Sequence, residues 1–588
     1  MPWYREIEDP LAAVNIHVFA TDYDGTIAEH NRVDAATARA LQRVRATGRK
    51  LLLVTGRMLP DLQSVCPDLA QLFDAVVAEN GALLYFPERR EMRRLGDPPE
   101  PALIEALERR GVPFAVGSAI LATDAPFAEA TLAAIQETGV ERSLVFNKGA
   151  LMLLPGGVTK GTGLTAALAA LELSPRNMVG IGDAENDHAF LAMCECSVAV
   201  ADAVPALRER ADYVTRGMAS VGTVEFIEEH LLNDLVDLVP RLVRHHLRLG
   251  EAADGAAVAV PAHGTRLLIV GPSGSGKSTL TGVLAERVLE AGRTLLLLDP
   301  EGDYRTLAEV PGVVVFGGKG EQALPTPEEM DQLLRHSHTS LVLDLSAMTL
   351  AEKVPYATKV LATVATVRSA TGLPHWLIID EAHHVLPAEG SPAVDLVRPG
   401  AEGLALITLD PGELAASVRP LPNVVASTEL VAFQAGVRTV LTARAGRGDA
   451  LDIPGPVLER GEAALAWLEP TARAMRFRVT RRRVHHRRHV RKYTEGELPP
   501  ERSFFFRGPA GALNLRAVNL VRFAELAEGV DEATWAHHLA GREYSAWVRE
   551  MIKDPELADE IAAIETAGAP PGESRRQVLE RVRDRYSV

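Results

Sequence analysis

Short apolar runs alternate with amphipathic helical stretches along most of the chain, in two separate series. The first series extends from residue 16 to about 230, and the stretch 34–48 is typical of its helical patterns. Its apolar runs lie at 16–22, 50–56, 74–80, 177–183 and 196–202. This alternation predicts a parallel sheet covered by helices.

A different segment interrupts the first series between about residues 83 and 155. It is rich in Pro and Gly and has short apolar runs of its own, which predicts an inserted cap. Residues 246–262 are mostly small and show neither helical nor strand periodicity, so we predict a linker there. The first domain is therefore expected at residues 1–245.

The second series occupies residues 263–484 and predicts another α/β domain. Its apolar runs lie at 265–271, 294–299, 313–318, 340–345, 375–380, 405–410 and 473–479. Residues 485–588 begin with a basic segment and continue with apolar residues at helical spacing, which predicts a small helical accessory domain. The expected fold class is α/β, with two doubly wound parallel-sheet domains and a helical C-terminal domain.

Composition narrows the class of protein. The 588 residues are 47% hydrophobic and 24% charged, and no apolar stretch is long enough to span a bilayer. The N-terminal residues lack a secretory pattern, and the only cysteines, Cys66, Cys194 and Cys196, show no metal-site or disulfide spacing. We expect a soluble cytoplasmic protein whose cysteines are small buried residues. The net charge of −16 argues against nonspecific nucleic-acid binding by the whole surface.

Two carboxylates follow the first apolar run directly. In open α/β sheets, ligands bind in the crevice beyond the carboxyl ends of the strands. There Asp22 can attack phosphorus to form an aspartyl-phosphate, while Asp24 protonates the leaving oxygen and later activates water. The alternative is that both are turn residues, since Asp is common in turns. Three further motifs, in order along the chain, favour phosphoryl chemistry.

These motifs supply the other groups that phosphoryl transfer needs. Thr55 follows an apolar run and can bind a phosphoryl oxygen, and Lys160 precedes a helical pattern, where its ammonium can contact nucleophile and phosphate. Asp183 and Asp187 are spaced to hold one Mg²⁺ across a single turn. The four motifs, with a cap between the Thr and Lys motifs, resemble those of the haloacid dehalogenase superfamily, subclass IIB.

The resemblance covers residues 14–230 and implies roles for the motif residues. Asp22 would be the nucleophile and Asp24 the general acid and base, with Thr55 and Lys160 binding phosphate. Asp22, Asp183 and the main-chain carbonyl of Asp24 would hold Mg²⁺, with Asp187 supporting the site. The second acid, Asp24, favours a phosphatase over an ion pump. The substrate would be a small phosphorylated metabolite, either phosphoglycolate or a sugar phosphate.

A phosphate-binding loop opens the second series. It follows an apolar run and precedes a helical pattern, which is the context that makes the motif meaningful. Its glycines let main-chain N–H groups surround the phosphates, its lysine reaches the terminal phosphates, and its serine ligates Mg²⁺. The predicted nucleotide-binding residues are Gly271, Gly274, Gly276, Lys277, Ser278 and Thr279.

An acidic pair ends a later apolar run. Asp380 is predicted to hold the water shell of magnesium, and Glu381 to polarise the attacking water. With the surrounding motifs, residues 265–470 resemble HerA/FtsK-like ATPases, which implies ATP as ligand and a homo-oligomer. The chain departs from the family pattern at Thr408–Asp410, where family members often carry a Thr-Gln sensor. The candidates for a subunit-crossing arginine are Arg419, Arg438, Arg444 and Arg447.

A basic run follows at residues 473–492, with ten Arg or Lys and three His. A polyanion partner is one interpretation. Apolar and basic residues alternate in its first part, however, so we favour an edge strand with one solvated face. His485, His486 and His489 could bind metal but lack a matching ligand set, and the phenylalanines near residue 505 are predicted core residues.

The leading hypothesis is a Mg²⁺-dependent phosphatase joined to an ATP-hydrolysing domain. A second makes the chain a nucleic-acid translocase with an auxiliary phosphatase domain, against which the net charge and the altered sensor count. A third is a phosphatase and kinase pair, although Glu381 beside Asp380 argues for water as the acceptor. A fourth is a nucleotide-dependent switch with incidental turnover.

Overall fold

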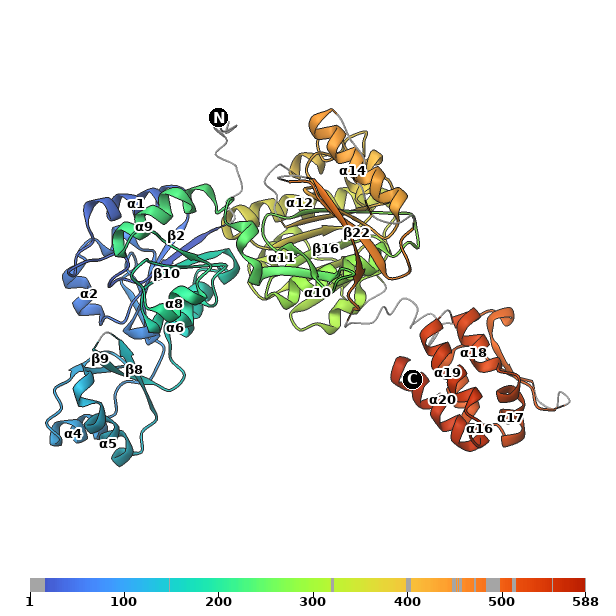
Figure 1. Cartoon of the computed structure of the whole chain (residues 1–588), viewed down its shortest axis with the longest axis horizontal. Coiled ribbons are helices and arrows are strands. Elements are labelled where there is room, and N and C mark those ends of the chain that lie inside the picture. Colours follow the sequence, from blue (N-terminus) through green and yellow to red (C-terminus); the bar gives the residue numbers. More distant parts are fainter. Residues whose placement is uncertain are drawn as a thin grey trace. The chain divides into compact units, whose positions relative to one another are not determined.

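The computed structural model describes residues 16–147, 149–318, 322–397, 403–446, 451, 453, 457–469, 472–482, 498–509, 514–552 and 554–586. The chain divides into two compact units, one of residues 1–302 with 310–482 and one of residues 303–309 with 483–588. Figure 1 shows the elements in sequence colours. The first unit holds two α/β sheets and the second is mainly helical, which confirms the predicted fold class.

The first sheet has eight strands in the order β12-β11-β10-β1-β2-β3-β4-β5. Its parallel strands are β1 (Val18–Thr21), β2 (Lys50–Val54), β3 (Ala75–Ala78), β10 (Met178–Gly182), β11 (Cys196–Ala199) and β12 (Tyr213–Val214). The main helices around it are α1 (Ala35–Ala46), α2 (Leu59–Val65), α3 (Leu69–Leu72), α6 (Lys160–Ala170), α7 (His188–Leu191), α8 (Pro205–Arg210) and α9 (Ala219–Glu229). Chain order changes direction at β1, which places the crevice for ligands at the end of this strand.

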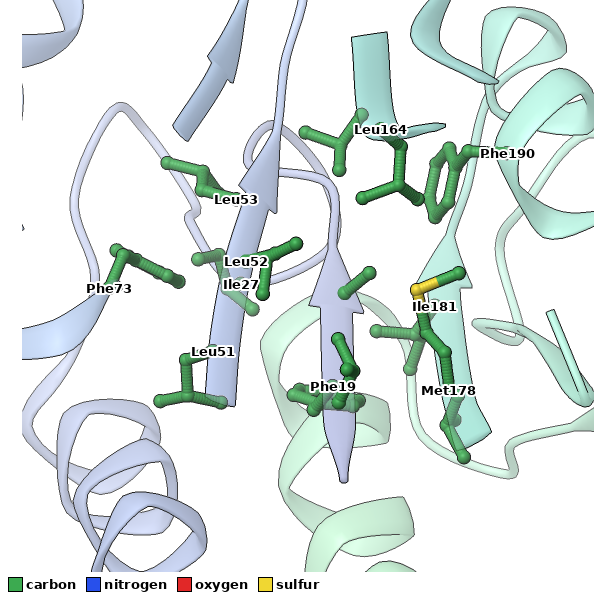
Figure 2. Close-up of a cluster of buried hydrophobic side chains, with 14 of the residues drawn as sticks. Phe19, Ile27, Leu51, Leu52, Leu53, Phe73, Leu164, Met178, Ile181 and Phe190 are labelled. Atoms are coloured by element: carbon green, nitrogen blue, oxygen red, sulfur yellow. The ribbon is translucent and has the colours of Figure 1, made fainter. Parts of the chain in front are cut away.

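The core of this domain lies on both faces of the central strands. Figure 2 shows Phe19 on β1, Leu52 on β2 and Ile181 on β10 among the clustered apolar side chains, with Leu164 and Phe190 from the helices. All five are completely buried. Strands that are covered on both faces read as continuous apolar runs, which is why the sequence pattern identified them. Cys66, Cys194 and Cys196 are free and buried, as predicted.

The cap is smaller than the sequence suggested. Strands β4 (Leu83–Phe86) and β5 (Glu91–Arg94) extend the first sheet as an antiparallel edge, so residues 83–94 belong to the core domain. A tight turn at Glu79–Gly81 returns the chain from β3 to β4, and this continuity was hidden by the Pro- and Gly-rich composition. The cap sheet has the order β6-β7-β9-β8, with β6 (Ala115–Val116), β7 (Leu121–Asp124), β8 (Arg142–Asn147) and β9 (Ala150–Pro155). Its helices are α4 (Pro101–Arg109) and α5 (Ala128–Thr138).

The second sheet has eleven strands in the order β14-β13-β23-β22-β21-β15-β20-β19-β16-β18-β17. Seven of the described strands are parallel: β15 (Arg266–Val270), β16 (Leu295–Asp299), β17 (Val313–Gly317), β18 (Ser340–Asp344), β19 (Trp376–Ile379), β20 (Leu404–Thr408) and β21 (Val424–Ser427). Its helices include α10 (Lys277–Glu290), α11 (Pro327–Leu334), α12 (Leu350–Thr371), α13 (Ala382–Val385) and α14 (Leu430–Ala445). Figure 1 shows α10 and α14 on opposite sides of the sheet, as expected for a doubly wound fold.

The predicted linker at residues 246–262 is wrong. This segment forms a hairpin of β13 (His246–Glu251) and β14 (Ala257–Pro261), and β13 joins the second sheet by pairing with β23 (Arg473–Val479). Leu247, Leu249, Val258 and Val260 are buried at alternating positions, but the small residues between the strands concealed this period of two. A Cβ on Gly250 would lie 2.1 Å from the Arg478 carbonyl oxygen, so glycine is required there.

A buried ion pair joins the two α/β domains. Glu195 precedes β11 and Arg293 follows α10, and their charged groups lie 2.5 Å apart with both side chains almost completely buried. Nearby, His375 Nδ1 accepts from the Thr294 N–H at 2.8 Å, so its Nε2–H is placed to donate to Ser174 Oγ at 2.9 Å. Burial, reinforced by Arg293, holds the pKa of His375 well below its usual value, so the ring is neutral.

Substitution of Glu195 should lower the stability of this junction. Burial would raise the pKa of Glu195, but Arg293 together with the neighbouring His245 and His263 outweighs it and the net shift is downward. The pair therefore contributes stability above the pKa of an unfolded glutamate, about 4.3, and loses it as pH falls through the lower folded value. We expect Glu195→Gln to lower the free energy of unfolding by about 3–5 kcal/mol at pH 7, and by less in acid, in urea denaturation followed by tryptophan fluorescence.

The matched control is Glu172→Gln. Glu172 lies 3.8 Å from Arg335 across the same junction, but 57% of its side chain is exposed. Exposed pairs contribute about 0–1 kcal/mol, so this variant should unfold almost as the wild type does. Equal losses in the two variants would contradict a special role for the buried pair.

The C-terminal unit has a core of its own. Strands β24 (Phe504–Phe506) and β25 (Leu515–Ala517) pair next to helices α16 (Leu520–Gly529), α17 (Glu532–Ala540), α18 (Glu543–Trp547), α19 (Pro555–Thr566) and α20 (Pro571–Tyr586), with a π-helical turn at Val548–Ile552. Phe504 and Phe506 are buried beside Phe523 and Trp547 in this core. The prediction that the three phenylalanines are core residues is confirmed for Phe504 and Phe506, whereas Phe505 is only partly buried. None of the described helices has both the length and the apolar character needed to cross a bilayer.

Candidate functional site

Three strand ends assemble the first site. Asp22, Thr55 and Asp183 directly follow β1, β2 and β10, and β1 lies between the other two strands in the sheet. The Asp22 N–H donates to the Ile181 carbonyl at 3.1 Å, and the Thr55 N–H donates to the Val77 carbonyl at 2.8 Å. These bonds continue the sheet pattern beyond the strands. The carboxyl ends therefore hold the three side chains at one edge of the sheet.

Lys160 connects the carboxylates of this site. It is the first residue of α6, which begins behind the capping residue Thr159. Lys160 Nζ lies 2.7 Å from Asp22 Oδ1 and 2.5 Å from Asp187 Oδ1, and its side chain is 1% exposed. The ammonium is thus held beside the predicted nucleophile, where it can also contact a phosphoryl oxygen.

The loop after β10 fixes the other end of this network. Asp187 Oδ2 accepts hydrogen bonds from the N–H groups of Asp183 and Ala184, both at 2.9 Å. A Cβ on Gly182 would lie 2.6 Å from the same oxygen, so only glycine leaves room for the carboxylate. The loop therefore turns Asp183 and Asp187 toward Asp22, as their spacing predicted.

Burial and charge compete within this cluster. Burial raises the pKa of Asp22 to about 8, helped by the Asp187 and Asp183 carboxylates and opposed by Lys160. Burial would lower the pKa of Lys160, but the Asp187 and Asp22 carboxylates outweigh it and raise the pKa above its usual value. The cluster holds three buried carboxylates and a single ammonium, which pairs with Asp22 and Asp187, so a bound cation would stabilise the ionised form of the nucleophile.

The carboxylates fit a divalent cation. Asp22, Asp183 and Asp187 each offer an oxygen within 4.8 Å of the others, and all three residues are buried. Mg²⁺ prefers oxygen ligands, and this donor set contains only oxygen. The side chain of Asp24 lies outside the cluster. The predicted contribution of Asp24 to metal binding is its main-chain carbonyl, as the resemblance implies. The residues present fit the predicted metal.

Arg57 holds the predicted general acid. Arg57 Nε and Nη2 donate to the two carboxylate oxygens of Asp24, each at 2.7 Å, and Arg57 Nη1 donates to Asp61 at 2.6 Å. Such a two-bond pair fixes both the position and the plane of the carboxylate. Arg57 was not among the predicted site residues. The sequence feature that could have indicated Arg57 is its position two residues after Thr55. The Thr55 hydroxyl accepts the Arg57 N–H at 3.1 Å.

Residues of the turn after β3 connect the core domain to the cap. The carboxylate of Glu79 is completely buried and accepts from the N–H groups of Ser118 and Ala119 at 2.8 and 2.9 Å. Asn80 accepts from Asn186 Nδ2 at 2.8 Å and contacts Met152 on β9 of the cap. The cap is thereby anchored next to the loop that carries Asp183 and Asp187. Neither turn residue was among the predicted site residues.

A cavity adjoins the general acid. It has a volume of about 670 Å³, and its lining includes Asp24, Glu29, Asn31, Asp202 and Met218. Its lining includes neither Asp22, Lys160 nor a residue of the cap, so the cavity lies beside Asp24 but outside the carboxylate cluster.

The second site lies at the end of β15. Gly274 and Gly276 have φ angles of 79° and 105°, which favour glycine, and α10 begins immediately afterwards at Lys277. Lys277 Nζ donates to the carbonyl oxygens of Gly271 at 2.8 Å and Pro272 at 3.2 Å, so it lies folded over the loop. Ser278 and Thr279 follow in the first turn of α10, where the Thr279 N–H donates to Gly276.

Two hydroxyl groups beside this loop add to the predicted set. The side-chain oxygens of Ser275 and Thr428 are shielded from solvent and have no hydrogen-bond partner among the described residues. Thr428 follows β21, the neighbour of β15, and its side chain lies beside Gly276. Both hydroxyls are placed to bind a phosphate oxygen. Thr428 was missed because its proximity depends on strand order.

The acidic pair lies at the end of β19, and β20 separates this strand from β15. Asp380 is buried, and its Oδ1 accepts the Glu381 N–H at 2.9 Å. Glu381 has a φ of 45°, a left-handed conformation that is costly for a side chain of this kind and concentrates at functional sites. Thr408 ends β20 in the predicted sensor position, and its hydroxyl lies 3.1 Å from His383 Nδ1. The phosphate loop and the acidic pair thus lie at the same edge of the sheet.

The candidate arginines differ in their surroundings. Arg419 donates to the carbonyl oxygens of Gly412 and Leu414, and Arg444 to those of Pro420 and Pro422, so both stabilise local chain geometry. Arg438 is exposed on α14. Arg447 lies outside the described residues. The choice of a subunit-crossing arginine remains a prediction.

The described part of the basic run is a structural strand. Residues Arg473–Val479 form β23, paired on one side with β22 (Glu462–Trp467). Phe477 is buried, Arg476 pairs with Glu462 at 2.5 Å, and Arg482 forms a buried pair with Glu286 on α10 at 3.0 Å. The predicted strand at residues 473–479 is confirmed, but it is not an edge strand, because β23 also pairs with β13 on its other side. His485, His486 and His489 lie outside the described residues.

Comparison with known proteins identifies the first domain. The family model of haloacid dehalogenase-like hydrolases matches residues 19–119 and 104–227. Phosphoglycolate phosphatase of Methanothermobacter thermautotrophicus is 31% identical over 226 residues, which cover 37% of this chain and 99% of that protein. The chain belongs to the haloacid dehalogenase-like hydrolases. Phosphoglycolate phosphatase 2 of Saccharolobus solfataricus is 30% identical over 36% of this chain and 91% of its own length.

The haloacid dehalogenase-like domain is followed by a second domain that also matches a known family model. The family model described as the central domain of helicase HerA matches residues 248–363. This match begins within the β13–β14 hairpin, which agrees with the assignment of the hairpin to the second sheet. A haloacid dehalogenase-like hydrolase from Bacteroides thetaiotaomicron, known from its crystal structure, is 18% identical over 36% of this chain and 98% of its own, with a TM-score of 0.33. The chain thus combines a haloacid dehalogenase-like hydrolase domain with a second domain that resembles the central domain of helicase HerA over residues 248–363.

Proposed function

We propose that this haloacid dehalogenase-type enzyme is a Mg²⁺-dependent phosphomonoesterase for a small phosphorylated metabolite, with an aspartyl-phosphate intermediate on Asp22. The observation that carries the proposal is the position of Lys160 Nζ between Asp22 and Asp187, with Asp183 in the same carboxylate cluster. This arrangement combines a nucleophile, a phosphate-binding cation and a cation-binding set at one sheet edge.

The reaction follows from the placement of these groups. A carboxylate oxygen of Asp22 attacks phosphorus, the bond between phosphorus and the ester oxygen breaks, and Asp24 gives its proton to the leaving oxygen. Asp24 then takes a proton from water, whose oxygen attacks phosphorus and releases phosphate and the Asp22 carboxylate. Arg57 orients Asp24, while Lys160 and Thr55 hold the phosphoryl oxygens.

Asp22, Asp183 and the main-chain carbonyl of Asp24 would hold Mg²⁺, with Asp187 in support. When bound, the ion neutralises charge on the phosphoryl group and on the buried carboxylates. Lys160 alone supplies one positive charge against three carboxylates. This charge imbalance supports a requirement for the ion.

Phosphoglycolate is the first candidate substrate. Two curated relatives that this chain matches over 91% and 99% of their lengths are phosphoglycolate phosphatases. The small cap, with four described strands and two described α-helices, suits a small leaving group. Sugar phosphates are the second candidate class.

The HerA-like domain is proposed to bind and hydrolyse ATP. Lys277 would bind the terminal phosphates, Ser278 would ligate the Mg²⁺ of the nucleotide, and Glu381 would polarise water. The hydroxyls of Ser275, within the loop, and Thr428, after the neighbouring strand β21, support this role because both lie at the loop without another hydrogen-bond partner among the described residues. A homo-oligomer is part of the proposal, and nucleic acid is not a favoured partner.

Metal removal tests the phosphatase proposal. We expect protein treated with EDTA to lose phosphate release from phosphoglycolate, because the buried carboxylates repel a phosphate dianion when no cation is bound. Added Mg²⁺ should restore turnover. The assay measures phosphate release from phosphoglycolate, sugar phosphates and nucleoside monophosphates in parallel. Full turnover in EDTA would refute the metal requirement, and no turnover of any ester with Mg²⁺ would refute the phosphatase proposal.

A further inference from the structure

Two histidines follow the acidic pair of the HerA-like domain and lie close to its glutamate. Glu381, His383 and His384 each offer one ligand atom, and these atoms all lie within 4.8 Å of one another. His383 Nδ1 lies 3.5 Å from Glu381 Oε2, and the rings of His383 and His384 have centroids 4.1 Å apart. His383 is buried, which restricts the motion of its ring. His384 is exposed, so a metal ion can reach the group from solvent.

Hydrogen bonding prepares His383 to act as a ligand. The Thr408 hydroxyl donates to the Asp410 carbonyl at 3.1 Å, so it is free to accept from His383 Nδ1, which lies 3.1 Å away. In this tautomer Nε2 carries no proton and is the atom that can bind metal, so the Glu381 carboxylate, which lies nearest Nδ1, has to turn toward Nε2 to share the ion. Metal-binding histidines commonly donate their second N–H to a neighbouring acceptor in this way, which fixes the ring and the tautomer. Glu413 Oε2 lies 4.0 Å from Nε2 and offers a further carboxylate.

The side-chain chemistry of these residues indicates which metal ions the site would bind. Two imidazoles and a carboxylate suit Zn²⁺ and related transition metals, whereas Mg²⁺ prefers oxygen ligands only. We propose that Glu381, His383 and His384 form a Zn²⁺ site, distinct from the carboxylate cluster of the phosphatase domain. Glu413 is placed to complete a four-ligand shell.

Zinc at this place would inhibit the HerA-like domain. Glu381 is the residue proposed to polarise the attacking water, and a carboxylate bound to Zn²⁺ cannot do so. This second part rests on the proposed ATP hydrolysis, whereas metal binding does not. Inhibition should therefore lower the rate of ATP hydrolysis and leave nucleotide binding intact.

Co²⁺ provides a direct readout of binding. The probe is Co²⁺ added to the full chain in excess Mg²⁺, which occupies the oxygen-only site, and the measurement is visible absorption of the metal. His485, His486 and His489 are replaced by Ala in all proteins compared, because they could also bind the probe. We expect one equivalent of Co²⁺ to give an absorption band that Zn²⁺ removes. His384→Ala should weaken Co²⁺ binding at least tenfold, and the matched control His336→Ala, at another exposed histidine, should not.

Inhibition is measured in the same proteins with ATP as substrate. Zn²⁺ should inhibit the His336→Ala control, and His384→Ala should need at least tenfold more Zn²⁺ while hydrolysing ATP normally without it. Co²⁺ binding unchanged by His384→Ala would overturn the site. Binding that depends on His384 without any inhibition would overturn the second part. Absence of ATP hydrolysis in every protein would refute the proposed ATPase, while the absorption band would still support the metal site.

Discussion

Asp22→Asn should abolish ester hydrolysis, with a loss on the order of 10³-fold or more in kcat, because the amide cannot form the aspartyl-phosphate. The substitution preserves the size of the side chain and its place 2.7 Å from Lys160 Nζ. It also removes one of the three carboxylate charges from a cluster that contains a single ammonium. The folded state should therefore survive while the chemistry is lost. Phosphate release from phosphoglycolate in Mg²⁺ measures the effect.

The matched control is Asp68→Asn, at an exposed aspartate that precedes α3 and makes no side-chain capping bond. It should hydrolyse esters at the wild-type rate. Thermal unfolding of both variants checks that the domain is intact. Substantial turnover by a folded Asp22→Asn protein would show that the nucleophile is another group, and the aspartyl-phosphate mechanism would have to be abandoned.

Lys277→Ala should reduce ATP hydrolysis by about 10²-fold or more, because the variant loses the cation that is placed to stabilise charge on the terminal phosphates. Lys277 Nζ now contacts the Gly271 and Pro272 carbonyl oxygens, so it must leave them to reach the nucleotide. The side chain is anchored at the first residue of α10, which limits its reach to the loop. Phosphate release from ATP by the full chain measures the effect.

Lys359→Ala, at an exposed lysine on α12, serves as the matched control and should retain ATP hydrolysis. Each active-site variant should also be tested with the other substrate. Ester hydrolysis that survives in Lys277→Ala, together with ATP hydrolysis that survives in Asp22→Asn, indicates independent sites. ATP hydrolysis that persists in Lys277→Ala would contradict the proposed role of the loop.

The first site was predictable because its residues follow buried strands. Asp22, Thr55 and Asp183 each end an apolar run, and parallel strands bring their carboxyl ends to one sheet edge. Lys160 is the first residue of α6, and Asp187 lies in the turn after β10, so these two predicted positions also follow from the local sequence pattern. The local pattern of the sequence was therefore sufficient to predict that these five residues come together.

Other parts depended on contacts between distant segments. Residues 246–262 looked like a linker because their small side chains carry little periodic signal, yet backbone pairing with β23 places them in the second sheet. Residues 83–94 were assigned to the cap, although hydrogen bonds of β4 with β3 keep them in the core domain. Main-chain hydrogen bonding is independent of side-chain pattern, so these boundaries could not be predicted from composition.

The order of apolar runs and the residues that end them thus specified the two sheets and the chemistry at their edges. Pairings of charged and polar groups needed the folded chain. Arg57 beside Asp24, Thr428 beside the phosphate loop and Arg293 beside Glu195 join residues that are far apart in sequence or carry no motif. Periodicity reports which face of an element is buried, whereas these partners are set by strand order and by the way the domains pack.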